Sequence, residues 1–175
     1  MSQQTTHATV PGIAGPGTSP GLYVAFTATA AFVAALAASL SLMLAAPPWA
    51  MFMGWVAYFT RKPSLAEGLR TFACILAGLS LGACATMAVG ALGPALGSLV
   101  LPAVVFATGF AVIATRGLPL LNNLLGYFIG LITFFAAHPE PTLGSIGELA
   151  GATGLGSIAG WAAQAIERHL RRVIA

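Results

Sequence analysis

The sequence predicts an all-α, polytopic membrane protein whose six transmembrane helices form a 3+3 inverted repeat. Hydrophobic residues make up 58% of the 175-residue chain and charged residues only 6%, whereas a soluble domain carries about 25% charged residues. The apolar runs are interrupted by Pro, Gly and basic residues at intervals that suit membrane spans. The second half of the apolar region also repeats residues of the first half at a nearly constant offset.

The scarcity of charge excludes several classes of protein. The net charge of +3 comes from seven basic and four acidic residues, so no basic face exists to bind a nucleic acid. A soluble enzyme and a disordered chain are excluded by the hydrophobic content. We expect the lipid bilayer itself to be the main partner of this chain.

The two ends of the chain differ from its middle in composition. Residues 1–20 are rich in Ser, Thr, Gln, Pro and Gly and carry no Lys or Arg. A secretory signal begins with a basic segment, so we interpret this stretch as a disordered cytoplasmic tail. Residues 168–175 are interpreted as a basic cytoplasmic tail, which leaves 21–167 as the membrane domain.

Three spans are predicted in the first half, which we treat as repeat one, 21–90. The first span, 21–46, ends at a Pro-Pro pair. The second, 49–60, ends at an Arg-Lys-Pro segment and covers only about 22 Å from the preceding proline, so we expect a short or partly inserted helix. The third, 64–90, ends at a Gly-Pro turn.

Three more spans are predicted in repeat two, 96–167. The fourth, 96–115, is ended by an Arg-Gly pair, and the fifth, 118–137, by a His-Pro-Glu-Pro segment. The sixth, 142–166, ends at the basic tail. If both termini are cytoplasmic, all seven basic residues lie on or near the inside. This distribution obeys the positive-inside rule and predicts a multi-pass membrane protein with both termini in the cytoplasm.

The repeat is read from two alignments. The second and fifth spans align at an offset of 76, which pairs Phe52 with Phe128, and the third and sixth align at an offset of 78, which pairs Gly78 with Gly156. Each unit has three spans, an odd number, so the second copy enters the membrane inverted. Many transporters are built this way, with a site at the repeat interface. A duplicated packing unit without a conduit is the alternative.

Small residues recur at helical spacing in the third and sixth spans. Such stripes let helix backbones approach closely in lipid, and they also suit contacts between subunits, so we expect a homo-oligomer. The predicted helix-packing residues are Gly78, Gly82, Gly151, Gly156 and Gly160.

Aromatic and amide side chains are the candidates for solute binding. Aromatic residues gather in the second and fifth spans, where they predict a narrow, weakly polar constriction if the two repeats face each other; core packing or an interfacial belt is the alternative. Amides within an apolar run can bind a solute or cap a helix. The predicted pore or solute-binding residues are Phe52, Trp55, Tyr58, Phe59, Asn122, Asn123, Tyr127, Phe128, Phe134 and Phe135.

Residues for catalysis and metal binding are missing from the predicted spans. The chain has no Asp, and none of its three His lies within a span, so neither an aspartyl site nor a Ser-His pair forms at depth. We see no phosphate-binding motif and no cluster of metal ligands. The sequence therefore predicts no enzyme, no metal and no cofactor. Gln164, the last polar residue of the sixth span, is interpreted as interfacial.

A family resemblance rests on three short patterns. These are Trp49-x-x-Phe52-x-Gly54-x-x-x-Tyr58-Phe59, then Gly126-x-Phe128-Ile129-Gly130-x-x-x-Phe134-Phe135-Ala136, and finally Gly156-x-x-x-Gly160-Trp161. Over residues 22–165 the chain resembles the YcdZ-like family of bacterial inner-membrane proteins, a domain of unknown function. The resemblance implies a fold and a compartment. The layout is also similar in kind to urea, amide and formate channels, an analogy that does not transfer function.

Two functional hypotheses follow. The first is a passive channel or facilitator for a small neutral or weakly polar solute such as urea or a short amide, because the spans hold no carboxylate near the membrane centre to couple ion flow. The second is a structural or partner-binding membrane subunit that transports nothing.

Overall fold

The computed structural model describes residues 20–62 and 64–174, which form α-helices and short 3₁₀ turns without any strand. The predicted all-α class is therefore confirmed for this part of the chain. The predicted tail over 1–20 lies outside the described residues except for its last residue, which begins the first helix. The elements are α1 (Pro20–Met43), α2 (Pro48–Tyr58), α3 (Leu65–Leu96), η1 (Gly97–Leu99), α4 (Val100–Ala114), η2 (Thr115–Gly117), α5 (Leu124–Ala137) and α6 (Leu143–Ile174).

Among the described residues, two helical stretches are long and apolar enough to cross a membrane, in place of the six predicted. They are Pro20–Met43 and Leu65–Gly117, and the second stretch contains both α3 and α4. Helices α2 and α5 have only 11 and 14 residues, below the roughly 20 that a span needs. Helix α6 is long, but its glycines and polar side chains lower its hydropathy. The two stretches point to membrane association, and the six predicted spans are not confirmed.

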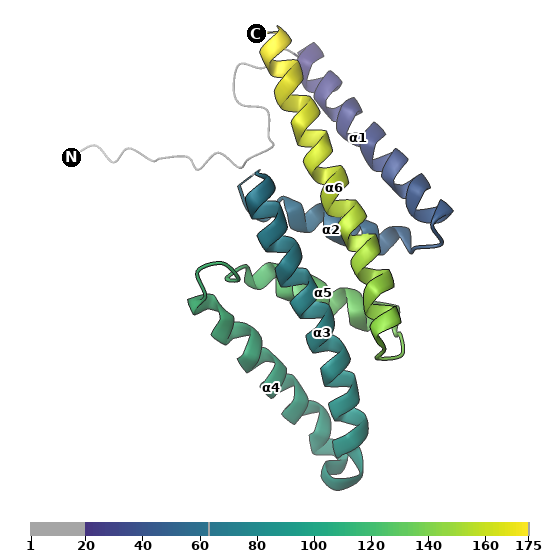
Figure 1. Cartoon of the computed structure of the whole chain (residues 1–175), viewed down its shortest axis with the longest axis vertical. Coiled ribbons are helices and arrows are strands. Elements are labelled where there is room, and N and C mark those ends of the chain that lie inside the picture. The colour runs from purple at the N-terminus through teal and green to yellow at the C-terminus, as the bar shows by residue number, and fades with distance from the viewer. Residues whose placement is uncertain (1–19, 63, 175) are drawn as a thin grey trace, which may run out of the picture.

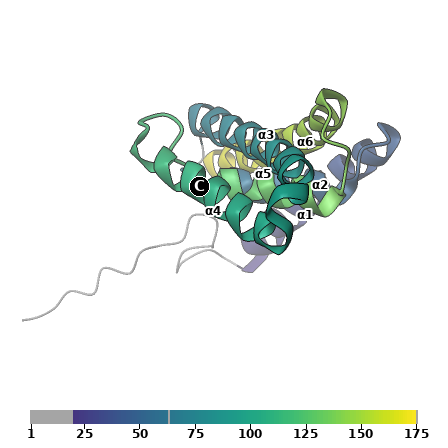
Figure 2. The same cartoon turned by 90° about the horizontal axis from the view of Figure 1, so that it is seen from below.

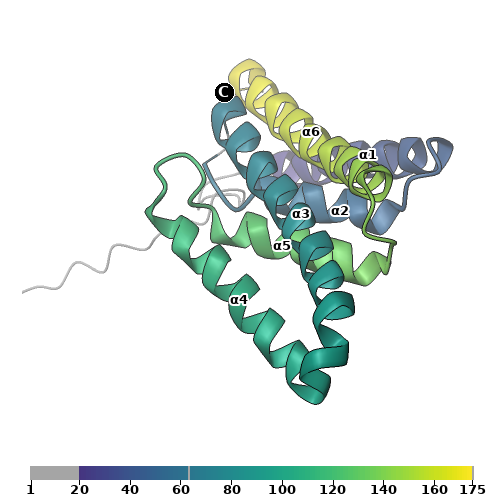
Figure 3. The same ribbon diagram turned by 60° about the horizontal axis from the view of Figure 1, so that its bottom comes forward.

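The two short helices pack against the two longest ones. Helix α2 lies mainly against α6, and α5 lies mainly against α3. Outside these pairs, α1 packs on α6 and α4 packs on α3, as Figure 1 shows. In Figures 2 and 3 the short helices lie between the long ones. The C-terminal end of α6 and the N-terminal end of α1 lie side by side (Figure 1).

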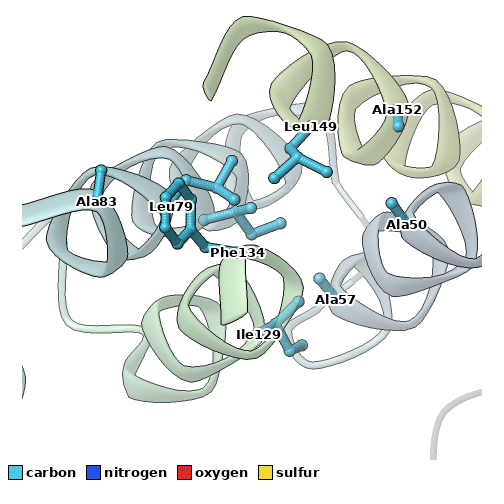
Figure 4. Close-up of a cluster of buried hydrophobic side chains, with 9 residues drawn as sticks. Ala50, Ala57, Leu79, Ala83, Ile129, Phe134, Leu149 and Ala152 are labelled. Carbon is cyan, nitrogen blue, oxygen red and sulfur yellow. The ribbon is translucent and has the colours of Figure 1, made fainter. Parts of the chain in front are cut away.

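The core lies where α2, α3, α5 and α6 meet. Apolar side chains from all four helices fill this junction, among them Leu79 of α3, Phe134 of α5 and Leu149 of α6. Figure 4 shows them pointing toward one another, with Ala50 and Ala57 of α2 on the other side. Burial of apolar surface provides the stabilisation at this junction, at about 25 cal/mol per Å².

Several helix ends differ from their predicted positions. The turn between the third and fourth spans was expected at 92–94, but α3 continues through Pro94 to Leu96. The chain reverses at Gly97, whose φ of 52° and ψ of −125° form a combination that only glycine adopts readily. Helix α5 begins at Leu124 instead of residue 118 because Asn123 caps it. Helix α6 runs on through the predicted basic tail to Ile174, where arginines in its last turn suit the helix dipole.

Candidate functional site

Glycines bring α2 and α6 into backbone contact. A Cβ on Gly54 of α2 would overlap the carbonyl group of Thr153 in α6. A Cβ on Gly156 of α6 would overlap the carbonyl oxygen of Met51 in α2. Ser157 Oγ also donates a hydrogen bond of 3.2 Å to the Gly54 carbonyl oxygen. Two backbones at this separation leave no room for side chains or solvent between them.

The same contact joins α3 and α5. A Cβ on Gly78 of α3 would overlap the carbonyl oxygen of Tyr127 in α5. A Cβ on Gly130 of α5 would overlap the carbonyl oxygen of Ile75 in α3. Gly130 was not among the predicted packing residues, although the sequence aligns it with Gly54.

The remaining predicted packing glycines occupy different environments. Gly82 lies under the Phe134 side chain, where a Cβ would come within 2.9 Å of it, and Gly160 lies under Tyr58 at 3.3 Å. Gly151 is exposed, and within the described part of the chain no atom of another helix lies within 4 Å of its Cβ position. Four of the five predicted glycines therefore contact another helix.

The predicted aromatic residues divide between the core and the surface. Tyr58, Tyr127 and Phe134 are buried, whereas Trp55 is partly buried. The other predicted aromatic residues lie at the surface and are 40–46% exposed: Phe52, Phe59, Phe128 and Phe135.

The ring contacts recorded for these residues stay within one helix. Trp55 and Phe59 have centroids 6.1 Å apart, as do Phe134 and Phe135, while Tyr58 and Phe59 are 5.6 Å apart. The structure thus gathers one aromatic group on α2 and another on α5. Core side chains fill the junction between the two groups (Figure 4).

The two adjacent asparagines, Asn122 and Asn123, form hydrogen bonds near the ends of helices in this structure. Asn123 is buried, accepts from the Gly126 amide, and donates from Nδ2 to Thr60 Oγ1 and Thr71 Oγ1 at 2.9 Å each. The exposed Asn122 accepts a hydrogen bond from Arg61. Asn123 therefore ties the end of α2 and the start of α3 to the N-terminus of α5.

An open-sided cavity of about 430 Å³ lies between α1, α2 and α6. We call it the polar cavity. The predicted residues Trp55 of α2 and Phe59, which directly follows α2, form one wall. Alanines of α1 and α6 form much of the remainder, and polar groups gather toward the end where α1 begins. Such a volume is at the lower end of small-molecule sites. Its polar or charged lining residues are Tyr23, Thr27, Gln164, Glu167 and Arg171.

Three of these polar residues share one face of α6, because they are spaced at i, i+3 and i+7. Arg171 donates from Nε and Nη2 to Glu167 Oε1, at 3.1 and 2.7 Å. Its guanidinium carbon also lies 4.4 Å from the centroid of the Phe26 ring. Gln164 Oε1 is buried, and within the described residues it has no hydrogen-bond partner. An unpaired buried acceptor is costly, and a rotation of the Gln164 amide toward the cavity would let this oxygen accept a hydrogen bond from a ligand.

A second cavity of about 410 Å³ lies between α3, α4 and α5. We call it the apolar cavity. Its walls include Phe128 and Phe135, two of the predicted pore residues, and no charged residue lines it. Its polar side chains are Thr86 and Thr108, and Thr86 Oγ1 is already bonded to the Gly82 carbonyl oxygen at 3.1 Å.

Sequence reasoning missed the polar end of the first cavity. Phe26, Glu167 and Arg171 were not candidates, and Gln164 was interpreted as interfacial. The spacing 164, 167 and 171 was a detectable signal, since it places three polar groups on one helical face. The described residues contain no cluster of three His, Cys, Asp or Glu able to hold a metal ion.

Comparison with known proteins shows the family. The chain belongs to the family described as "Protein of unknown function (DUF1097)", whose model matches residues 27–167. The predicted membership of an uncharacterised-domain family is thus confirmed. No curated protein and no solved structure matches the chain. The matched range includes α2 to α5 and most of α1 and α6, but Phe26 and Arg171 lie just outside it.

Proposed function

We propose that this member of the DUF1097 family is a multi-pass protein of the bacterial inner membrane that passively conducts a small, weakly polar solute. A planar molecule that donates N–H hydrogen bonds, such as urea or a short amide, is the expected solute. Both termini lie in the cytoplasm in this proposal, the chain forms homo-oligomers, and the YcdZ-like resemblance remains a prediction. The polar cavity is the solute site.

The observation that carries the proposal is the amide side chain of Gln164. It lines a cavity whose opposite wall is formed by Trp55 and Phe59, and its Oε1 is buried without a hydrogen-bond partner among the described residues. In this proposal a rotation of the amide presents this oxygen to the bound solute. An acceptor with aromatic faces nearby suits a flat solute with N–H donors, since such donors interact with both. The solute route therefore follows the α1–α2–α6 side of the molecule, because core side chains fill the junction between α2 and α5.

Paired helix contacts support the inverted repeat. The Gly54–Thr153 contact becomes the Gly130–Ile75 contact when 76 is added to the α2 residue and 78 is subtracted from the α6 residue. These are the offsets that the sequence alignment predicts. The Met51–Gly156 contact becomes Tyr127–Gly78 by the same operation, and Tyr58–Gly160 becomes Phe134–Gly82.

The two cavities follow the same offsets, which extends the proposed repeat to α1 and α4. On α6, Gln164 and Glu167 correspond to Thr86 and Val89 of α3. Five lining residues of α1 each precede a lining residue of α4 by 78 positions: Tyr23 and Leu101, Phe26 and Val104, Thr27 and Val105, Ala30 and Thr108, Ala31 and Gly109. Transporters built from inverted repeats hold substrates at the interface between the repeats, and the polar cavity is lined by α1 and α2 of repeat one and α6 of repeat two.

Stopped-flow light scattering on proteoliposomes tests the proposal, with urea, acetamide, formate and glycerol gradients and empty liposomes as the reference. We expect one solute to cross faster than through bare lipid. Trp55→Ala should change this flux, and Trp161→Ala should leave it unchanged because Trp161 lies outside the polar cavity. Equal effects of the two variants would contradict the assigned site. Flux no faster than lipid, with folded protein, would favour the partner-binding subunit.

A further inference from the structure

The polar cavity already contains a planar cation, the guanidinium group of Arg171. Its central carbon lies 4.4 Å from the Phe26 ring centroid. Two of its nitrogens donate to Glu167 Oε1, at 3.1 and 2.7 Å. Phe26, Glu167 and Arg171 all line the cavity. The charged end of the cavity is therefore a site where an aromatic face and a carboxylate hold one guanidinium.

The chemistry of this end matches a guanidinium better than an ammonium. A guanidinium stacks on an aromatic ring and donates two N–H bonds in one plane, whereas an ammonium is a compact, strongly hydrated charge. Gln164 lies one turn before Glu167 on α6 and also lines the cavity. Its Oε1 is buried without a partner among the described residues, and rotation of the amide would add this acceptor to the site. Carboxylate, amide oxygen and ring faces all attract N–H donors.

We propose that the polar cavity binds an organic monocation carrying a guanidinium group, and that Arg171 occupies the same place when this ligand is absent. The inference rests on the proposed solute site and adds a second, charged class of ligand to the uncharged solute proposed for it. The Arg171 side chain is 45% exposed and the Glu167 side chain 30%, so the pair has a free path to solvent. The incoming cation pairs with the Glu167 carboxylate and stacks on the Phe26 ring, and the Arg171 side chain turns away toward solvent.

The apolar cavity has phenylalanine rings in its wall, but it lacks the carboxylate, the amide and the arginine of this arrangement. Under the proposed repeat the positions of Phe26, Gln164 and Glu167 are taken by Val104, Thr86 and Val89. It has no carboxylate, and the Thr86 hydroxyl is bonded to its own helix. Binding of a cation is therefore expected on one side of the molecule only.

Isothermal titration calorimetry on the detergent-purified full chain tests the proposal with two probes, phenylguanidinium chloride and phenylurea. The probes have nearly the same shape and differ in charge. Arg171→Ala removes the internal guanidinium, and Arg172→Ala is the matched control, because it removes the same charge from α6 outside the cavity. All variants must keep the wild-type elution volume and melting temperature.

We expect Arg171→Ala to bind phenylguanidinium on the order of tenfold more tightly than the wild type, since a competing state is removed. Arg172→Ala should change the affinity far less. Adding Glu167→Gln to Arg171→Ala should weaken phenylguanidinium binding by roughly tenfold through loss of a charge-assisted bond, with phenylurea little affected. Equal gains for the two arginine variants, or equal gains for the two probes, would overturn the proposal.

The urea flux assay separates this inference from the proposed function. Flux of urea through the wild type, with no preference for phenylguanidinium over phenylurea in Arg171→Ala, would leave the facilitator standing and reject the cation site. Cation binding without solute flux in folded protein would establish the site and reject the facilitator. If Arg171→Ala does not fold, Arg171→Lys provides the same test, because a lysine keeps the charge but cannot stack a planar fork on Phe26.

Discussion

The polar and the apolar cavities share one architecture and differ in their contents. Each lies between three helices, α1, α2 and α6 in one case and α3, α4 and α5 in the other, and their volumes are about 430 and 410 Å³. Each has a phenylalanine in its wall, Phe59 directly after α2 in one and Phe135 of α5 in the other. One cavity ends in Gln164, Glu167 and Arg171, whereas the corresponding end of the other is apolar.

The difference indicates what the scaffold supplies and what individual side chains add. Close glycine contacts set the distance between the helices in both halves, and this distance leaves a void beside each short helix. Whether the void recognises a polar ligand then depends on a few residues of one helix face, because an apolar wall alone provides no directional interaction. Four predictions test this comparison, from the largest expected effect to the smallest.

The first prediction concerns the scaffold, which should be equally sensitive in the two halves. Gly54→Ala and Gly130→Ala each place a methyl group on a backbone carbonyl, and each should destabilise the fold by about 3 kcal/mol or more. Thermal melting in detergent with size-exclusion chromatography measures this. Gly147→Ala is the control, since no atom of another described element lies within 4 Å of its Cβ position. A large loss of stability for only one of these two variants would contradict the expected equal sensitivity of the two halves.

The second prediction concerns a polar anchor that only one short helix has. The residue before α2, Pro47, makes no side-chain cap, whereas Asn123 caps α5 and bonds two threonines. Asn123→Ala should cost about 2 kcal/mol of stability. The neighbouring Asn122→Ala should cost much less because Asn122 is exposed. Similar losses from both variants, measured by thermal melting, would contradict this role.

The third prediction concerns a variant that makes the lining of the polar cavity more like that of the apolar cavity. Gln164→Leu removes a buried acceptor with no recorded partner among the described residues and should stabilise the fold by about 1 kcal/mol. The same change should lower solute flux in proteoliposomes. Thr86→Val, its counterpart in the apolar cavity, should leave flux unchanged. A fall in both stability and flux for Gln164→Leu would show that this residue only supports the fold.

The fourth prediction is the smallest. Glu167 and Arg171 form an i,i+4 pair on α6, and both side chains are partly exposed. Glu167→Gln should therefore change stability by only about 0.5 kcal/mol, and less at high salt. Melting curves at low and high salt measure the effect. A loss several times larger would mean that this end of the cavity holds α1 and α6 together.

The sequence predicted the helical elements of the fold better than it predicted the residues of the candidate site. The apolar runs, the proline and glycine signals and the short second helix were all readable, because they depend on local properties of the chain. The short length of α5 could not be predicted from the sequence, since its start at Leu124 depends on the hydrogen bonds of Asn123 to Thr60 and Thr71. The aromatic residues were found, but their separation into core and surface depends on which helix each face meets.

The sequence by itself determined that the chain is helical and strongly apolar, because hydropathy and residue spacing report local preferences. Only the tertiary structure decided where the voids lie and what lines them. Pairing of α2 with α6 and of α5 with α3 filled the centre with side chains. The same pairing left Trp55 opposite α1 and placed Gln164, Glu167 and Arg171 beside Phe26. Contacts between helices far apart in the chain are set by packing, which local patterns do not specify.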